Sequence, residues 1–167
     1  MTAYKLKVGF TGTREGMTVR QWLNLADWFT DRATDQPRTP SEVHHGCCVG
    51  ADAEFVLAVI RGRVGETENR SWAEIHGHPS NLTAMTDRQI IEQCDVVRPE
   101  LPPLDRNQRI VDATNILLAC PRLESEEHRS GTWATIRYAR SIGRPVVIFY
   151  PSGMISIDQP KESPDGK

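Results

Sequence analysis

The chain carries two continuous apolar runs in its second half, NILLAC at 115–120 and PVVIFY at 145–150. Continuous apolarity, rather than alternation of apolar and polar residues, is typical of parallel strands that helices cover on both faces. Between these runs we predict an acidic loop at 123–128 and a helix over about 132–142. A strand, a helix and a second buried strand in this order predict an α/β fold.

The same alternation extends toward the N-terminus. Thr18 and Gln21 form a capping-box pattern at the start of one helix, Asp105 and Gln108 form another, and Gly62 is expected to end a third. Strand and helix alternating five times predict a Rossmann-like, doubly wound and mostly parallel sheet of about five or more strands, with helices on both faces. These further predicted elements are strands at 7–12, 43–46 and 72–78, helices at 19–29, 53–62, 87–94 and 106–113, and loops at 35–42 and 98–103.

Length and composition are those of one globular domain. Of the 167 residues, 38% are hydrophobic and 25% are charged. We expect this domain to span residues 1–150 and a flexible, polar tail to span 151–167. No apolar run approaches the roughly 20 residues that cross a bilayer, and the N-terminus shows no signal-like segment. We therefore expect a cytoplasmic protein without a membrane partner.

Charge and cysteine spacing argue against several classes of function. The formal net charge is −2, whereas a general nucleic-acid binder has a basic excess that collects phosphates. The four cysteines, Cys47, Cys48, Cys94 and Cys120, include no Cys-x-x-Cys motif. We therefore expect free thiols, and neither a zinc ribbon nor a redox pair.

The histidines and cysteines around residue 45 also suggest a metal site. His44 and His45 lie just before Cys47 and Cys48. Adjacent residues on an extended segment point to opposite faces, so these four side chains are not expected to converge. We expect no metal and no cofactor.

Four turns, which follow predicted strands or open predicted helices, are rich in glycine, hydroxyl or arginine residues. In chain order they are Gly9–Arg14, His45–Asp52, Leu104–Arg109 and Arg129–Thr135. In Rossmann-like sheets the ligand lies beyond the carboxyl ends of the strands, where glycines let backbone N–H groups approach it. A turn that opens a helix also presents free N–H groups and the positive helix end to an anion. The candidate ligand-binding residues are Gly12, Thr13, Arg14, Gly46, Gly50, Ala51, Asp52, Arg106, Asn107, Ser130, Gly131 and Thr132.

Each turn also has a purely structural interpretation. The first is neither a dinucleotide-binding glycine motif nor a P-loop, so it also fits a tight connection. Asp52 fits a helix cap as well as a ligand contact, and Arg106 fits a solvated helix start. No Gly-x-Ser-x-Gly or His-Glu-x-x-His motif is present, and we expect His76 and His78 to be structural or solvent-facing.

Together these turns resemble the SLOG superfamily, which joins the DNA-processing protein DprA with the LOG-type phosphoribohydrolases. Within it, the chain is most similar to the small YspA/YpsA-related branch of bacteria and phages. His45–Asp52 is similar to the family's Gly-Gly-Ala-x-Gly-Ala/Ile-Asp turn, with Cys47 and Cys48 in place of the usual Gly-Ala pair. The other matching segments are Val8–Arg14, Asp105–Asn107 and the strand and Gly-Thr turn between Asn115 and Thr132, and the match covers about residues 6–150.

This resemblance implies a Rossmann-like fold that binds a nucleotide or a nucleotide-derived ligand. LOG enzymes cleave the N-glycosidic bond of nucleoside monophosphates with an arginine, which Arg106 matches, and a glutamate, whose position holds Thr135 here. A threonine does not stabilise an oxocarbenium-like centre as a carboxylate does, unless Asp52 or Glu54 takes that role. Arg106, Asp52 and Glu54 are therefore the candidate catalytic residues.

The leading hypothesis is a protein that binds, senses or sequesters a nucleotide-type small molecule, because the turns suit an anion and no catalytic carboxylate is evident. The alternatives are a LOG-type nucleotide phosphoribohydrolase and DprA-like binding of single-stranded DNA, against which the net charge argues. The resemblance also implies a homodimer or higher homo-oligomer. The aromatic residues that we expect to supply its surface are Trp22, Trp28, Phe29 and Trp133.

Overall fold

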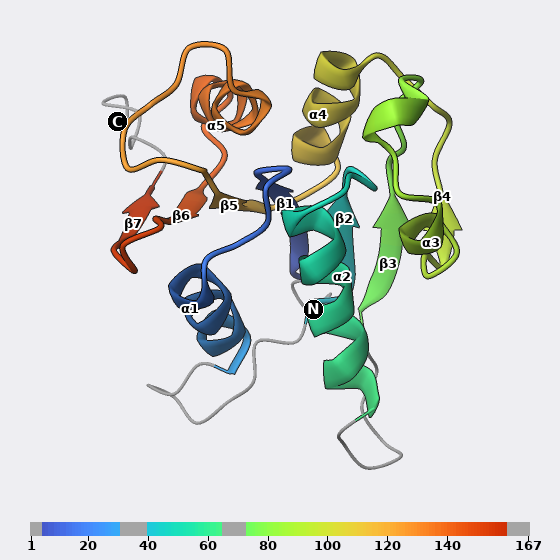
Figure 1. The fold of residues 1–167 in the computed structure, drawn as a ribbon, viewed down its shortest axis with the longest axis horizontal. Helices are drawn as coiled ribbons and strands as arrows, with labels where there is room; N and C mark the ends of the chain where they lie inside the picture. The colour runs from blue at the N-terminus through green and yellow to red at the C-terminus, as the bar shows by residue number, and fades with distance from the viewer. Residues whose placement is uncertain (1–4, 31–39, 65–72, 160–167) are drawn as a thin grey trace, which may run out of the picture.

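The computed structural model describes residues 5–30, 40–64 and 73–159, which form an α/β fold (Figure 1). Its strands make one seven-stranded sheet in the order β4-β3-β2-β1-β5-β6-β7. All neighbouring strands are parallel except β7, which is antiparallel to β6. The strands are β1 Lys7–Gly12, β2 Glu42–His45, β3 Glu74–Gly77, β4 Val96–Val97, β5 Ile116–Cys120, β6 Val146–Phe149 and β7 Ile155–Asp158. The helices are α1 Val19–Thr30, α2 Ala51–Val64, the 3₁₀ turn η1 Thr83–Met85, α3 Arg88–Ile91, α4 Pro103–Asp112 and α5 Gly131–Ser141.

The direction of strand order reverses at β1. The chain builds outward from β1 through β2 and β3 to β4, and then returns to place β5 on the other side of β1. Connections that leave two neighbouring strands in opposite directions open a crevice beyond their carboxyl ends, where doubly wound folds bind ligands. The predicted Rossmann-like fold is confirmed, and it places a crevice beyond β1 and β5.

The central strands alternate their side chains between two apolar cores. In β5, Leu118 and Cys120 face the core beneath α1 and α2, whereas Leu117 and Ala119 face the core beneath α4 and α5. Figure 1 shows these two helix pairs on opposite sides of the sheet. Both faces of β5 and of β6 are therefore dry, which is why these two strands are apolar without a break.

The capping box predicted at the start of α1 is present. Thr18 N–H donates to Gln21 Oε1 at 2.9 Å, and Gln21 N–H donates to Thr18 Oγ1 at 3.2 Å. The Gln21 amide also donates to the carbonyls of Pro121 and Phe149, at 2.8 and 2.9 Å. One buried side chain therefore caps the helix and joins it to the ends of β5 and β6.

Three predicted helix boundaries are wrong. Asp105 does not cap α4, which begins two residues earlier at Pro103 with Pro102 as its N-cap, because a proline in the first turn has no N–H group to leave unpaired. Gly62 does not end α2, which continues to Val64, since a glycine costs a helix only about 1 kcal/mol. The helix predicted over 87–94 is shorter: Asp87 caps α3, which ends at Ile91.

The sheet also extends beyond the predicted elements. Val96 and Val97 form β4, which is too short to show any periodicity. Ile155–Asp158 form β7 at the sheet edge, which corrects the expected start of the C-terminal tail. Its residues alternate in exposure, as expected for an edge strand. Residues 35–39 of the predicted loop, and 160–167 of the predicted tail, lie outside the described residues.

Of the aromatic residues expected at an oligomer surface, Trp133 is not available. Its side chain is 3% exposed and packs with Ile136 in the core beneath α5. Trp22 is exposed, whereas Trp28 and Phe29 are half-buried against the other core. Within the described residues, no helix is both long and apolar enough to cross a bilayer.

Three histidines at the ends of β2 and β3 form a buried network. His44 Nε2 lies 3.0 Å from Glu42 Oε2, and His44 Nδ1 lies 2.9 Å from His78 Nε2. A carboxylate only accepts, so the His44 proton is assigned to Nε2, which donates to Glu42. His44 Nδ1 is then an acceptor, and His78 Nε2 donates to it. His76 stacks on His44 with ring centroids 4.3 Å apart and bridges Glu74 and Arg98. His76 and His78 are therefore structural.

This network predicts that the protein loses stability in weak acid. Burial lowers the pKa of His44 to about 4 and that of His78 to about 3, from an ordinary value of 6.5. The unfolded chain therefore takes up these protons first, so the stabilisation is complete above about pH 6.5 and is lost as the pH falls toward the folded values. Between pH 7 and pH 5 we expect the free energy of unfolding to fall by about 2 kcal/mol for each histidine.

Urea unfolding at both pH values measures this change. His78→Gln removes one of the titrating groups and is expected to flatten the pH dependence, whereas His128→Gln, in an exposed loop, is expected to leave it unchanged. Equal pH dependence in all three proteins would contradict the prediction.

Candidate functional site

A cleft of about 790 Å³ lies beyond the carboxyl ends of β1 and β5, at the point where strand order reverses. Its volume falls within the roughly 300–1,000 Å³ of small-molecule sites. Ten of the twelve predicted ligand-binding residues line it: Gly12, Thr13, Arg14, Gly46, Asp52, Arg106, Asn107, Ser130, Gly131 and Thr132. Turns that are far apart in the sequence therefore meet in one cleft.

Gly50 and Ala51, the other two predicted residues, lie behind the cleft and join its first two turns. Ala51 N–H donates to Thr13 O at 3.0 Å. Gly50 has φ +85°, and a Cβ there would collide with the backbone carbonyl of Arg14. The requirement for glycine at this position therefore comes from the packing of one turn on another.

The Arg106 side chain is 4% exposed and contacts the second turn, His45–Asp52. Its guanidinium donates to the carbonyl of Gly46 and, at 3.0 Å, to that of His78. Its second terminal nitrogen lies 3.4 Å from Cys48 Sγ, and its Nε donates to Asn107 Oδ1 at 2.7 Å. Arg106 therefore joins α4 to the ends of β2 and β3, a role that the helix-start position alone does not reveal.

Asp52 bonds the backbone of the same turn. Its Oδ2 accepts from the backbone N–H groups of Gly46, at 2.9 Å, and Cys48, at 3.2 Å. Burial raises the pKa of this carboxyl, and His45 and Arg106 oppose the rise. Asp52 thus braces the turn by accepting two of its backbone N–H groups.

The other two positions relevant to hydrolysis do not supply a carboxylate to the cleft. Glu54 Oε2 accepts from Met17 N–H at 2.6 Å, beside the Gly16 turn and outside the cleft lining. Thr135 is 1% exposed, and its hydroxyl donates to Gly131 O at 2.8 Å within α5. The position that the resemblance matches to the glutamate of LOG enzymes is therefore a buried threonine whose hydroxyl already has a partner.

The loop at 121–130 brings cations that the sequence interpretation missed. Arg122, Glu127, His128 and Arg129 line the cleft, together with Arg137 of α5. The sequence predicts only an acidic loop at 123–128, but the segment follows β5 directly and so passes over the carboxyl edge of the sheet. The position of the loop after a central parallel strand was the available signal.

Two of the five arginines that line the cleft have no partner among the described residues. Arg122 pairs with Glu127 at 2.5 Å, and Arg137 pairs with Glu126 at 2.7 Å. Within the part of the chain that the structure describes, the side chains of Arg14 and Arg129 make neither a hydrogen bond nor an ion pair, and both are exposed. These two guanidinium groups are free to bind an anion.

The N-terminus of α5 opens into the same cleft. Ser130 is its N-cap, and the Ser130 hydroxyl accepts from Trp133 N–H at 3.3 Å. Gly131 and Thr132 form the first helical positions and line the cleft. The first N–H groups of a helix and its positive end both favour an anion.

Among the residues that the structure describes, two groups of side chains bring metal-ligating atoms within 4.8 Å of one another. In the first, Glu42, His44 and His76, both ring nitrogens of each histidine already have partners in the buried network. In the second, His45 and Cys47 meet Cys94. The four neighbouring residues considered in the sequence do not form a group, and Cys94 arrives instead from a distant segment.

Comparison with known proteins finds relatives in structure alone. The molybdenum cofactor binding protein from the phototrophic bacterium Rippkaea orientalis has a TM-score of 0.58 and 16% identity, over 89% of this chain and 78% of that one. The structural genomics target TM1055 has a TM-score of 0.53 and 14% identity, over 84% of this chain and 72% of that one. These likenesses establish a shared fold. No protein family and no curated protein matches this chain in sequence.

The contacts of Arg106 predict that its loss destabilises the fold. Arg106→Ala leaves the carbonyls of Gly46 and His78 without this donor and the Asp52 carboxyl without its cation. We expect the free energy of unfolding to fall by roughly 2–4 kcal/mol. Arg109→Ala removes an exposed arginine from the same helix and is expected to change it by less than about 0.5 kcal/mol. Denaturant unfolding of both variants measures the difference, and equal losses would contradict the role given to Arg106.

Proposed function

We propose that the cleft binds a nucleotide or a nucleotide-derived small molecule, and that the protein senses or sequesters this ligand. The observation that carries the proposal is the set of cations around the cleft: five arginines line it, against three acidic residues. Phosphate groups are recognised by arginine forks and by helix N-termini, and both are present here at the switch point of a doubly wound sheet.

The polar lining of the cleft suits a phosphate. Arg14 comes from the first turn and Arg129 from the loop before α5, and Thr13 and Thr132 add hydroxyl groups to the same lining. Neither arginine must give up a protein partner to bind, because neither has one among the described residues. An anion therefore gains charge-assisted hydrogen bonds here without breaking existing ones.

The other lining residues suit the uncharged part of such a ligand. Phe10, Met85, Pro103, Leu104 and Ile110 contribute apolar surface to the same cleft. Small-molecule sites combine such apolar walls with a few oriented polar groups. A base or a similar flat ring against this wall, with its phosphate toward the arginines, uses both kinds of surface.

The acidic residues of the cleft favour binding over hydrolysis. Asp52 is buried and accepts from two backbone N–H groups. Glu127 is paired with Arg122 at 2.5 Å, and Glu15 lies 3.7 Å from the same arginine. A glycosidase of this kind needs a carboxylate that faces the sugar, and each of these has another partner.

The comparisons support this proposal at the level of the fold. One structural neighbour is described as a molybdenum cofactor binding protein, so a similar fold holds a small molecule in that protein. We further propose that the chain is a member of the SLOG superfamily and of its YspA/YpsA-related branch. The support is that the turns carrying the resemblance gather around one cleft.

Titration calorimetry against a panel of nucleoside monophosphates and diphosphates, cyclic nucleotides and ADP-ribose-type compounds tests the binding. We expect micromolar or tighter binding of at least one compound, weakened by salt. Arg14→Ala and Arg129→Ala are each expected to weaken it about tenfold, the cost of one charge-assisted hydrogen bond. Arg88→Ala, an exposed arginine of α3 outside the cleft, is the matched control.

The absence of binding to every compound at protein concentrations that reveal micromolar affinity would refute the proposal. A single-stranded oligonucleotide in the same panel separates it from DNA binding. If the oligonucleotide alone binds, and does so less tightly as salt increases, the DprA-like alternative is correct.

The second candidate function is a LOG-type nucleotide phosphoribohydrolase. The observation in its favour is that Arg106 and the Gly131–Thr132 turn, which match those enzymes, line one cleft. Incubation with nucleoside monophosphates, followed by chromatography for free base, tests it. We expect no release above the uncatalysed rate, because Thr135 supplies no carboxylate. Release that Asp52→Asn abolishes in a folded variant would establish hydrolysis and identify the acid.

A further inference from the structure

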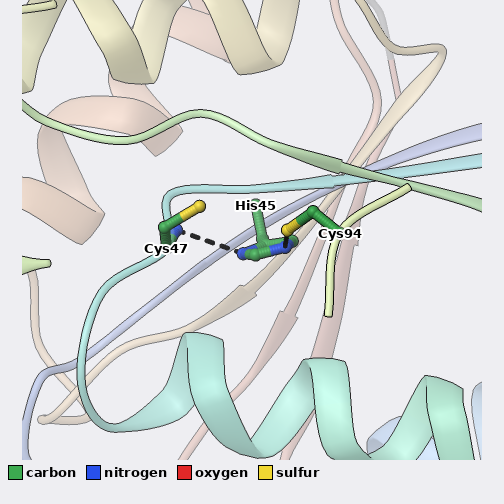
Figure 2. Close-up of side chains that lie close together, drawn as sticks. All are labelled: His45, Cys47 and Cys94. Carbon is green, nitrogen blue, oxygen red and sulfur yellow. Dashed lines mark hydrogen bonds between the residues drawn. The ribbon is translucent and has the colours of Figure 1, made fainter. Parts of the chain in front are cut away.

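A histidine and two cysteines, none of which lines the cleft, meet at the ends of β2 and β3. Figure 2 shows the His45 ring between Cys47 and Cys94, with a dashed line to each. His45 Nε2 lies 3.4 Å from Cys94 Sγ, although the two residues are 49 positions apart in the sequence. The two sulfur atoms and a ring nitrogen all lie within 4.8 Å of one another.

Gly77 makes room for both sulfur atoms. A Cβ at this position would lie 2.7 Å from Cys47 Sγ and 2.7 Å from Cys94 Sγ. Real Cβ atoms do not approach other atoms so closely, so the two thiols share the space that a side chain would fill. Cys47 itself has φ 54°, a left-handed conformation that is uncommon outside glycine. The backbone therefore turns the Cys47 sulfur into this shared space.

The partners of His45 determine which ring nitrogen carries its proton. Cys47 N–H donates to His45 Nδ1 at 3.1 Å, so Nδ1 is an acceptor and the neutral ring carries its proton on Nε2. That proton points at Cys94 Sγ. Donation to the sulfur stabilises a Cys94 thiolate, in place of the hydrogen bond that the protonated thiol makes to Ile90 O at 3.3 Å.

The two thiols differ in access and in acidity. Cys94 is half-buried, whereas Cys47 is fully buried. The thiol of Cys47, as a hydrogen-bond donor, and then His45 lower the pKa of Cys94, and the same hydrogen bond together with burial raises the pKa of Cys47. Ionisation is therefore favoured at Cys94, the less buried of the two residues, over Cys47.

The tautomer of His45 favours thiol chemistry over metal binding. A histidine ligand binds its metal through a bare nitrogen and donates its other N–H to an acceptor. Here Nδ1 already accepts a backbone N–H, and Nε2 holds the proton that faces Cys94. A metal would have to displace that proton and the hydrogen bond that orients the ring.

We propose that Cys94 and Cys47 form a reactive thiol pair, oxidised by a hydroperoxide to a disulfide and restored by thiol reductants. The Cys94 thiolate attacks one peroxide oxygen, the O–O bond breaks, and Cys94 becomes a sulfenic acid while hydroxide or alkoxide leaves and takes up a proton. The Cys47 sulfur then attacks the Cys94 sulfur, and the sulfenic OH leaves with the Cys47 proton as water. Two thiols are oxidised and one hydroperoxide is reduced.

Oxidation of the reduced protein with one equivalent of hydrogen peroxide tests the pair. After an acid quench, alkylation under denaturing conditions and peptide mapping, we expect a Cys47–Cys94 disulfide with Cys48 and Cys120 still alkylated, and dithiothreitol should reverse it. Cys94→Ser is expected to abolish the product. Cys47→Ser is expected to leave a Cys94 sulfenic acid that a 1,3-dione reagent traps.

Cys48→Ala is the matched control, because it removes the neighbouring cysteine and is expected to leave the disulfide yield unchanged. The folded protein gives a second measurement that needs no variant. Its Cys94 should react with iodoacetamide at least tenfold faster at pH 7 than Cys48 or Cys120. As the pH is raised, the rate at Cys94 should reach its maximum before pH 8.

Four outcomes would overturn the proposal. The first is a disulfide that contains Cys48. The second is equal alkylation of all four cysteines, and the third is the absence of any disulfide under conditions that oxidise glutathione. The fourth is one equivalent of tightly bound zinc in protein purified under reducing conditions, released only when the thiols are modified, which would make the cluster a metal site.

Discussion

The Arg106 guanidinium donates to the carbonyls of Gly46 and His78, and so one side chain of α4 joins the ends of β2 and β3 beneath the cleft. A buried guanidinium is costly unless its donors are matched, and here carbonyls, a sulfur atom and the Asn107 amide oxygen match them. Asp52 completes the arrangement by accepting the N–H groups of the same turn. The position of the whole second turn therefore depends on this arginine and this carboxylate.

Because Arg106 is used in this way, the arginines around the cleft divide into two groups. Arg106 shapes the cleft floor, while Arg14 and Arg129 stand at its rim without partners among the described residues. The first group contributes stability and the second is available for recognition. The same turn has a second side, where Cys47 packs against Cys94 and His45 beside the buried histidines of β2 and β3. Polar contacts thus replace apolar packing at this end of the sheet.

Much of the fold follows from local sequence patterns. The apolar runs around Leu117 and Val147 are continuous because their residues alternate between two dry faces. The capping box of Thr18 and Gln21 is a contact between near neighbours, and it forms as its spacing predicts. The short strand β4 and the true start of α4 were missed, because two residues show no period and a proline at the first turn hides a helix start.

The sequence by itself determined the parallel architecture, the order of the turns and the edge of the sheet at which ten of their residues meet, since these depend on apolar periodicity and on chain direction. Only the tertiary structure decided which of those residues face the cleft and which hold it together. It turned Glu54 toward Met17, buried Arg106 and brought Cys94 to His45. Such contacts join segments tens of residues apart, and they depend on where each side chain ends in space, which spacing along the chain does not specify.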